Sequence, residues 1–382
     1  MIPYGKHHID YEDIKSVTKV LKSDNLTQGP LIKTFENAIS KYVGVRYAVA
    51  VTSCTAGLHL AAMVSKMQKG KTLLTSPITF VSTANSSIFC GAKTIFADVD
   101  NNINISVKDV DLICSKKKIN AIAPVHFGGL PCDMKRLKKI ADKYKAIIYE
   151  DAAHAFGATF PDGSKVGSCK YSDMTVFSFH PVKSIAMGEG GIITTNNIKI
   201  YQKLLLLRNN GIEKNKNKFK EKKFDNPWYY EMQELGYHYR ITDIQCALGL
   251  SQLKKINKFL AKRRNIAKRY DFELKDLRNC EIIHKNLRGH SSNHLYILKV
   301  NFRKLGISRT ELMKLFRKKE IGTQVHYIPV TSQPYFKNKG YNKNNLPNSY
   351  SYYEGALSIP LYYDLTSKQQ NHVINHIKKI IG

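Results

Sequence analysis

Seven short apolar runs, separated by segments with helical spacing, fill the first 200 residues and limit the folds open to this chain. Each run is about as long as a β-strand and is rich in Val, Ile, Phe or Thr. Strands that are apolar throughout and alternate with helices are typical of a parallel sheet covered by helices. We therefore predict an α/β fold with a large, mostly parallel sheet. The runs cover residues 47–51, 72–81, 92–100, 121–129, 145–153, 174–180 and 190–195.

The last third of the chain predicts a second, smaller α/β unit. Two expected helices begin with capping boxes, Ser308 with Glu311 and Thr366 with Gln369. Strand candidates at 295–300 and 322–330 flank the first of them. The lysine-rich stretch 211–228 lacks apolar periodicity and is expected to be a mobile surface loop. We predict a large domain with the N-terminal segment over residues 1–245, and a small C-terminal domain over residues 246–382.

The charge balance is strongly positive, with 60 Lys and Arg against 30 Asp and Glu in 382 residues, a formal net charge of +30. Such a field attracts nucleic acid, an anionic membrane or an anionic small substrate. The lysines are spread along the whole chain without a recognised nucleic-acid motif, so we favour a lysine-biased solvated surface. No apolar run approaches the roughly 20 residues that cross a bilayer, and the start lacks a signal-peptide core. We expect a cytoplasmic protein that binds neither nucleic acid nor membrane.

Metal and disulfide chemistry are not expected. The seven cysteines are scattered, odd in number and without a C-x-x-C pair. This pattern argues against a disulfide framework and against a structural zinc site.

One lysine, Lys183, stands between a strand-like run and a glycine cluster in FSFHPVKSIAMGEGG, residues 177–191. A lysine on such a loop suits Schiff-base chemistry with a carbonyl compound, provided that its pKa falls below the usual ~10.4. Upstream, another apolar run ends at Asp151, at the sheet edge where parallel-sheet enzymes bind ligands. Pyridoxal 5'-phosphate (PLP) would use both residues, because it needs a lysine to hold it and an acid to keep its pyridine nitrogen protonated.

PLP also needs a phosphate-binding cup. Thr55, Ala56 and Gly57 open an amphipathic helix, where free backbone N–H groups favour an anion, and the Ser178 hydroxyl could add a donor. Taken singly these signals are weak, since a strand-end Asp is more often a cap and a helix start is more often only that. The prediction therefore rests on the occurrence of all these signals together and in this order along the chain.

The sequence resembles the nucleotide-sugar aminotransferases of the DegT/StrS type, which are PLP enzymes of the aspartate-aminotransferase fold (type I). The resemblance extends over essentially the whole chain and rests on a string of motifs in order. It implies a homodimer with active sites at the interface, and a transaminase rather than a dehydratase, because some relatives that dehydrate have histidine in place of the lysine. The motifs are LTQGPLIKTFENAISKYVG, EDAAHAFGA, FSFHPVK, GEGG, RITDIQCALGLSQL and LSIPLYYDLT.

The resemblance also implies roles for single residues. Lys183 matches the Schiff-base lysine and Asp151 the partner of the pyridine nitrogen. His154 is similar to the residue beside the phenolic oxygen of the cofactor, and Phe80 to the aromatic residue that stacks on its ring. The phosphate cup would comprise Thr55, Ala56 and Ser178.

One position departs from the family pattern. The family usually has Asn in G-x-N-x-R, contributed across the dimer interface to the cofactor phosphate, whereas this chain has GYHYR with His238 there and Arg240 retained. Histidine still donates a hydrogen bond, although its charge titrates near neutrality. We predict that His238 contacts the PLP phosphate of the partner subunit.

The substrate follows less directly from the motifs. FSFHPVK, ALGLSQLKK and GTQVHYIPVTSQPYF look most like the subgroup that aminates C4 of a UDP-linked 4-keto-6-deoxy-N-acetylhexosamine toward pseudaminic acid, with glutamate as donor. A dTDP- or GDP-linked 4-keto-6-deoxyhexose is the alternative within the class, in a route such as O-antigen synthesis, and a non-catalytic regulatory or anion-binding relative is the alternative outside it. The expected substrate-binding residues are Thr27, Gln28, His180, His326 and Tyr327.

Overall fold

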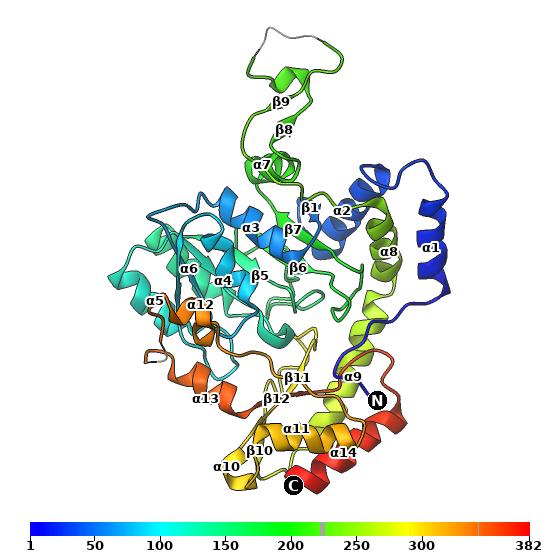
Figure 1. Cartoon of the computed structure of the whole chain (residues 1–382), viewed down its shortest axis with the longest axis vertical. Helices are drawn as coiled ribbons and strands as arrows, with labels where there is room; N and C mark the ends of the chain where they lie inside the picture. Colours follow the sequence, from blue (N-terminus) through cyan, green and yellow to red (C-terminus); the bar gives the residue numbers. More distant parts are fainter. Residues whose placement is uncertain (222–225, 343) are drawn as a thin grey trace.

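The computed structural model describes residues 1–221, 226–342 and 344–382. Its larger unit is built on a seven-stranded sheet of order β1-β7-β6-β5-β4-β2-β3 (Figure 1). Neighbours from β6 through β5, β4 and β2 to β3 are parallel, and β7 is antiparallel to β1 and β6. The expected mostly parallel sheet of an α/β fold is confirmed. The strands are β1 (Tyr47–Val51), β2 (Thr72–Thr75), β3 (Lys93–Phe96), β4 (Ala121–Ala123), β5 (Ile147–Asp151), β6 (Met174–Ser178) and β7 (Gly191–Thr195).

Helices cover both faces of this sheet, because its strands are apolar on both sides. Successive residues of β1 show this: Ala50 belongs to one buried core and Val51 to the other. The core of Ala50 is completed by α2, α6 and α8, and the core of Val51 by α3 and α7. The helices are α1 (Tyr11–Leu21), α2 (Pro30–Val43), α3 (Cys54–Val64), α4 (Val81–Ile88), α5 (Val107–Lys116), α6 (Met134–Tyr144), α7 (Ile198–Arg208), α8 (Asp243–Lys254) and α9 (Ile256–Glu273).

The smaller unit is an antiparallel sheet of order β10-β11-β12, covered by helices that include α11 and α14. Both expected capping boxes are present. Both ends of the chain lie beside this unit (Figure 1), and Ile2 packs into its core. Its elements are β10 (Cys280–Ile282), β11 (Tyr296–Val300), α10 (Phe302–Leu305), α11 (Arg309–Lys318), α13 (Pro347–Gly355), β12 (Ala356–Ile359) and α14 (Ser367–Ile381). The short helix α12 (Pro334–Lys337) packs through Phe336 against Ala84 of α4 in the large unit.

The strand expected at 322–330 is wrong. β11 instead pairs with β10 and β12, so both of its edges are taken. The segment 322–330 makes only one bridge, between Gln324 and Ser358, and Pro329 has no N–H to offer a ladder. The N-terminal half of α9 packs in the large unit and its C-terminal half in the small unit, and the domain boundary at 245/246 stays a prediction.

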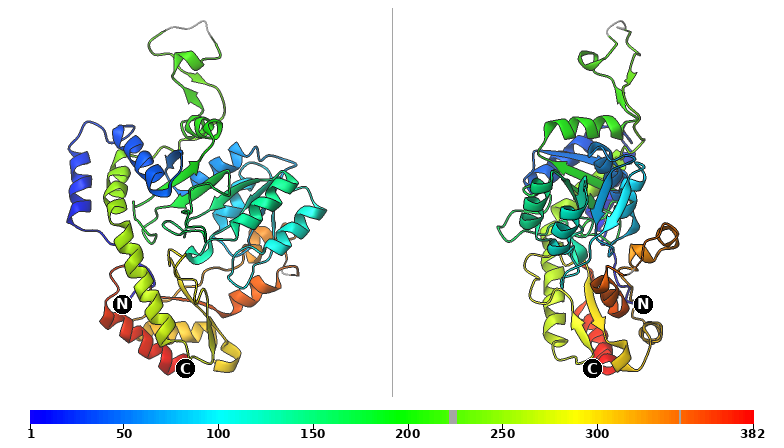
Figure 2. Two further views of the ribbon diagram at one scale, coloured as in Figure 1. Left: turned by 180° about the vertical axis from the view of Figure 1, so that it is seen from behind. Right: turned by 90° about the vertical axis from the view of Figure 1, so that its left-hand side faces the viewer.

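A hairpin arm projects from the body of the molecule (Figures 1 and 2). It consists of β8 (Ile212–Glu213) and β9 (Glu231–Met232), antiparallel with Ile212 opposite Met232, and the residues between them. The stretch predicted to be a mobile loop is therefore partly ordered as a hairpin, and residues 222–225 of it lie outside the described residues. No helix within the described ranges is long and apolar enough to cross a membrane.

Candidate active site

Lys183 lies on the loop between β6 and β7, at one edge of the large sheet. Its backbone N–H donates to the carbonyl oxygen of His180 at 2.9 Å, and this hydrogen bond closes a turn over residues 180–183. Burial of the side chain lowers the pKa of Lys183 to about 8, although Cys54 and Asp151 oppose the fall. A substantial fraction of the amine is therefore neutral near pH 8, as a nucleophile requires.

Asp151 ends β5, and its charge acts on Lys183, raising the pKa of the lysine against the effect of burial. Its side chain is 4% exposed. Thr83 Oγ1 donates to Oδ2 at 2.5 Å and the Ala153 N–H donates to Oδ1 at 3.0 Å. Burial raises the pKa of Asp151, whereas these two bonds and the charge of Lys183 lower it. Two hydrogen bonds hold the carboxylate in a position with little access to water. A nearby positive charge would stabilise its ionised form there.

Three aromatic or imidazole rings line the site next to Asp151. Nε2 of His154 lies 3.0 Å from the Tyr327 hydroxyl, and the two rings are stacked with centroids 6.0 Å apart. Phe80 precedes α4, and its ring centroid is 6.5 Å from that of Tyr327. Phe80 is nevertheless 59% exposed, so much of its side chain is accessible. Burial and then Lys183 hold the pKa of His154 well below its usual range, which makes His154 neutral at pH 7.

The expected phosphate cup brings together three separate segments. The Ser53 hydroxyl caps α3 by accepting from the Ala56 N–H at 3.1 Å, and Thr55 lies in the same first turn. Ser178 ends β6 opposite Gly191 in the β7 ladder. A Cβ on Gly191 would lie 2.5 Å from the carbonyl carbon of Ser53, so this close approach requires glycine. Ser178 and the N-terminus of α3 are therefore brought close together by Gly191, and a helix N-terminus favours an anion.

The segment with Thr27 and Gln28 also reaches this edge. Thr27 bridges Thr242, the N-cap of α8, and the Gln245 side chain of α8 donates to the Glu189 carbonyl at 2.7 Å in the turn after Lys183. Both Thr27 and Gln28 are exposed. The fold thus gathers the LTQGP motif and the lysine loop at the two sides of the α8 N-terminus.

The remaining predicted residues lie in different surroundings. His326 is buried, with Nδ1 2.8 Å from the Ser358 hydroxyl, and burial followed by the charge of Lys183 lowers its pKa to about 3. His180 is exposed on the lysine loop. His238 is exposed at the base of the hairpin arm, where its backbone bridges Asn209, and Arg240 donates to the Asn209 side chain at 2.6 Å.

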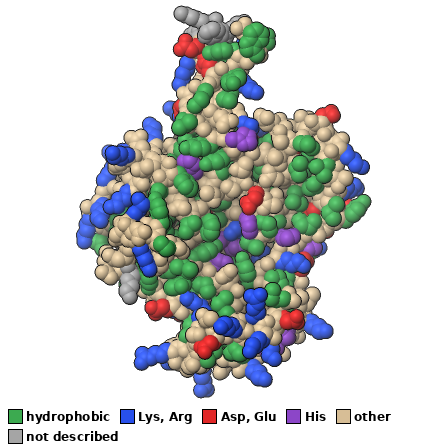
Figure 3. Space-filling view, in the orientation of Figure 1, with side chains coloured by type: hydrophobic (Ala, Val, Ile, Leu, Met, Phe, Trp, Pro, Cys, Tyr) green, Lys and Arg blue, Asp and Glu red, His purple; other side chains and the backbone are tan. Residues whose placement is uncertain are grey.

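Two residues of the site were not predicted. Thr83 holds Asp151 from the first turn of α4, and His294 lies with its ring centroid 4.4 Å from that of His154. The position of Thr83, three residues after Phe80, is a weak sequence signal that it belongs to the same site. No local sequence pattern indicates His294. Figure 3 shows histidine side chains gathered in the middle of one face of the molecule.

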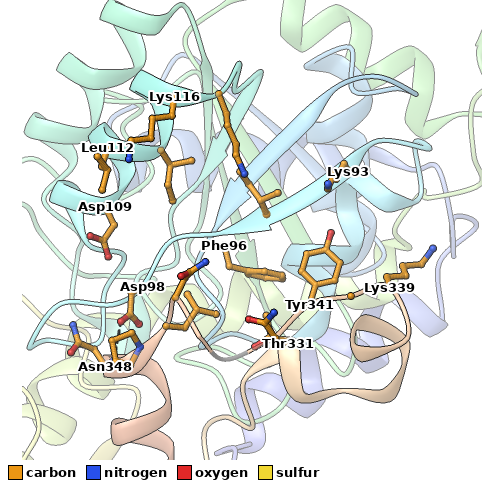
Figure 4. A pocket seen from close by; sticks show the side chains of 18 residues that line it. Lys93, Phe96, Asp98, Asp109, Leu112, Lys116, Thr331, Lys339, Tyr341 and Asn348 are labelled. Carbon is orange, nitrogen blue, oxygen red and sulfur yellow. Dashed lines mark hydrogen bonds between the residues drawn. The ribbon is translucent and has the colours of Figure 1, made fainter.

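A cavity of about 770 Å³ lies elsewhere. It opens between β3, α5 and the segment 339–348, and Figure 4 shows Lys93, Lys116 and Tyr341 around it. It shares no lining residue with the Lys183 site, and Asp98 at its rim is engaged by the amides that open α13. Within the described ranges no group of His, Cys, Asp or Glu side chains is arranged to hold a metal ion.

The chemistry of the Lys183 site fits PLP. It offers an amine with a lowered pKa, a buried carboxylate, an accessible aromatic side chain and a helix N-terminus with Ser178 close to it. In addition, Nδ1 of His154 is buried without a hydrogen-bond partner, which indicates that a group absent from the protein itself is accommodated there.

Comparison with known proteins agrees with this chemistry. The sequence model of the DegT/DnrJ/EryC1/StrS aminotransferase family matches residues 7–378. A UDP-4-amino-4,6-dideoxy-N-acetyl-beta-L-altrosamine transaminase of Campylobacter jejuni is 37% identical over 383 residues, covering 100% of this chain and 98% of the relative.

Solved structures show the same similarity. PseC of Helicobacter pylori, an aminotransferase involved in the biosynthesis of pseudoaminic acid, superposes with a TM-score of 0.91 at 29% identity, covering 100% of this chain and 99% of PseC. The PLP form of Spr1654 from Streptococcus pneumoniae, a putative sugar aminotransferase, gives a TM-score of 0.88 at 27% identity, with 99% of this chain and 98% of Spr1654 covered.

Proposed function

Because the chain belongs to the DegT/DnrJ/EryC1/StrS aminotransferase family and is a PLP-dependent sugar aminotransferase, we propose that it transfers an amino group to C4 of a nucleotide-linked 4-keto-6-deoxy sugar. The proposed substrate is a UDP-linked 4-keto-6-deoxy-N-acetylhexosamine, with glutamate as amino donor. This choice is supported by the 37% identity to the altrosamine transaminase and by the similarity to PseC. We place the reaction in the cytoplasm.

The observation that carries the assignment of residues is the joint placement of Lys183 and Asp151. When bound, PLP supplies an electron sink that stabilises negative charge on the carbon bearing the amine. Lys183, with its lowered pKa, is assigned to hold the cofactor and to move the proton at that carbon. Asp151 is assigned to the pyridine nitrogen, where its buried charge favours the protonated form.

The other residues are assigned to binding and orientation. Thr55, Ala56 and Ser178 would hold the phosphate, because Gly191 brings the α3 N-terminus and Ser178 close together. Phe80 would cover the pyridine ring with its accessible side chain, and His154 would lie at the phenolic oxygen. Thr27, Gln28, His180, His326 and Tyr327 are proposed to face the sugar nucleotide.

We further propose that the enzyme is a homodimer with its active sites at the interface. The hairpin arm supports this, since Trp228, Tyr230 and Met232 are 76%, 55% and 61% exposed on this projection. Exposed apolar side chains grouped in this way are typical of an interaction surface. His238 lies at the base of the same arm, and its predicted contact with the partner's PLP phosphate is retained as a proposal.

The substrate is tested directly by incubating the enzyme, PLP and glutamate with a panel of 4-keto sugar nucleotides carrying UDP, dTDP or GDP. Mass spectrometry is expected to show amine formation with the UDP-linked N-acetylhexosamine. Preference for a dTDP- or GDP-linked hexose would replace the sugar and keep the reaction class. A colourless protein that glutamate does not change, and that aminates no member of the panel, would favour the regulatory alternative.

A further inference from the structure

One segment of the smaller unit, residues 291–294, closes directly on His154. The Ser292 hydroxyl donates to the His154 carbonyl oxygen at 2.6 Å, and the Ser292 and His294 N–H groups donate to the carbonyl oxygens of Gly129 and Gly128, both at 3.1 Å. Gly129 has φ +97°, and a Cβ there would lie 2.2 Å from the Ser292 hydroxyl oxygen. The approach of the two units is therefore built into the backbone at this point.

This segment places the ring of His294 against that of His154. The centroids are 4.4 Å apart and the ring planes differ by 33°. The two residues are 5% and 6% exposed, and Nδ1 of each is buried without a hydrogen-bond partner. Burial, first of all, lowers the pKa of both histidines well below the usual range, so both rings are neutral at pH 7 and their contact carries no charge repulsion.

Among the ring contacts described for His154, the one with His294 is the closest, since the ring centroids of Tyr327 and Phe127 lie 6.0 and 6.3 Å away. The side chain of His154 makes one hydrogen bond, from or to Nε2, with the Tyr327 hydroxyl. Rotation of the imidazole about its Cβ–Cγ bond would carry Nε2 away from that hydroxyl. The ring of His294 blocks this rotation on one side, and the ring of Tyr327 stacks nearby.

We propose that His294 is a positioning residue, whose ring packs on His154 and holds it in the orientation that the cofactor needs. The inference rests on the proposed role of His154 at the phenolic oxygen of PLP. It assigns to the smaller unit a direct share in the cofactor site, because Ser292 and His294 together set both the backbone and the ring of His154.

The test compares PLP binding and the visible circular dichroism of bound PLP in full-length variants, neither of which requires turnover. We expect His294→Ala to weaken PLP binding about tenfold and to change the dichroism, as expected for residues that couple directly. His294→Phe keeps a flat ring and should stay within about twofold of the wild type. His290→Ala, which changes an exposed histidine directly before this segment, is the matched control and should leave both measurements unchanged.

A double-mutant cycle separates positioning from a general loss of stability. In a His154→Ala background, His294→Ala should produce no further loss, because its target is gone. Losses that add, a His294→Phe variant as weak as His294→Ala, or a His294→Ala variant equal to the His290→Ala control would each overturn the proposal. If His294→Ala does not fold, His294→Gln replaces it with the same expected loss.

The cycle also distinguishes this proposal from the proposed function. If His154→Ala binds PLP with unchanged affinity and dichroism, the assignment of His154 at the cofactor is wrong, and His294 then has nothing to position. If His154→Ala weakens binding but His294→Ala does not, only the inference about His294 fails.

Discussion

The amine of Lys183 is set for its role by burial more than by any charged partner. Its pKa of about 8 lies below that of a lysine in water, so it gains a neutral fraction as the pH rises through that value. We predict that the rate at which the apoprotein takes up PLP covalently rises between pH 7 and pH 9 with a midpoint near 8. Stopped-flow absorbance measures this rate.

Two further experiments complete the test of Lys183. Lys183→Ala should show no covalent uptake, and borohydride should attach PLP to the wild-type chain at Lys183 alone, as peptide mass spectrometry will show. A rate that is flat across pH 7 to 9, or a Lys183→Ala protein that still turns over, would refute the assignment.

Asp151 illustrates a functional charge that costs stability. Its raised pKa means that folding favours the protonated form, so the ionised carboxylate is unfavourable at every pH above its folded pKa. We predict that Asp151→Asn lowers kcat at least about 100-fold and leaves the thermal midpoint of the apoprotein unchanged or higher. Steady-state kinetics and calorimetry measure the two quantities. A clear fall in the apoprotein midpoint would show that the carboxylate is structural.

Among the connections between elements, β7 approaches the start of α3 at very close range. Gly191 has no room for a side chain against Ser53. We predict that Gly191→Ala displaces the first turn of α3, destabilises the protein by about 1–3 kcal/mol and weakens PLP binding. Thermal unfolding and PLP titration test this.

The matched control for Gly191 is Gly289→Ala. A Cβ on Gly289 would meet nothing within 4 Å, and its φ lies outside the left-handed region. Its effect should stay within about 0.5 kcal/mol, with unchanged PLP binding. Equal losses in the two variants would contradict the packing argument.

The strands of the large sheet could be predicted because each carries its own signal. All seven apolar runs contain a strand, from Tyr47–Val51 to Gly191–Thr195, since apolar residues buried on both faces are needed wherever helices cover a sheet twice. In the smaller unit, residues 322–330 have the same strand-like composition but are not a strand. Composition indicates that a segment can form a strand. Which segment pairs with β11 depends on the tertiary structure, which places β12 rather than residues 322–330 beside it.

For the assembled molecule, the hairpin arm is the feature that a single chain leaves unexplained. It exposes three large, mainly apolar side chains to solvent, those of Trp228, Tyr230 and Met232. We predict that the protein is a dimer and that replacing all three with Ser increases the monomer fraction, because apolar contact area stabilises such interfaces. Sedimentation velocity measures the distribution.

Phe272→Ser provides the control for the arm. Phe272 is 68% exposed on α9, in the same range as the arm residues, and lies far along the chain from them. Its replacement should leave the dimer unchanged. An arm variant that remains dimeric would remove the arm from the interface and, with it, the support for His238 reaching the partner's phosphate.

The sequence by itself determined the α/β class and the large sheet, and it predicted Lys183 and Asp151 as the two residues proposed for the chemistry. Lys183 and Asp151 could be predicted because Asp151 ends one apolar strand and Lys183 lies shortly after the end of the next. The carboxyl ends of parallel strands meet at one edge of a sheet. Only the tertiary structure decided that Thr83 holds Asp151, that Gly191 admits the start of α3, and that His294 lies on His154. These contacts join residues 68, 138 and 140 positions apart, and no local pattern records which distant side chain will be packed against which.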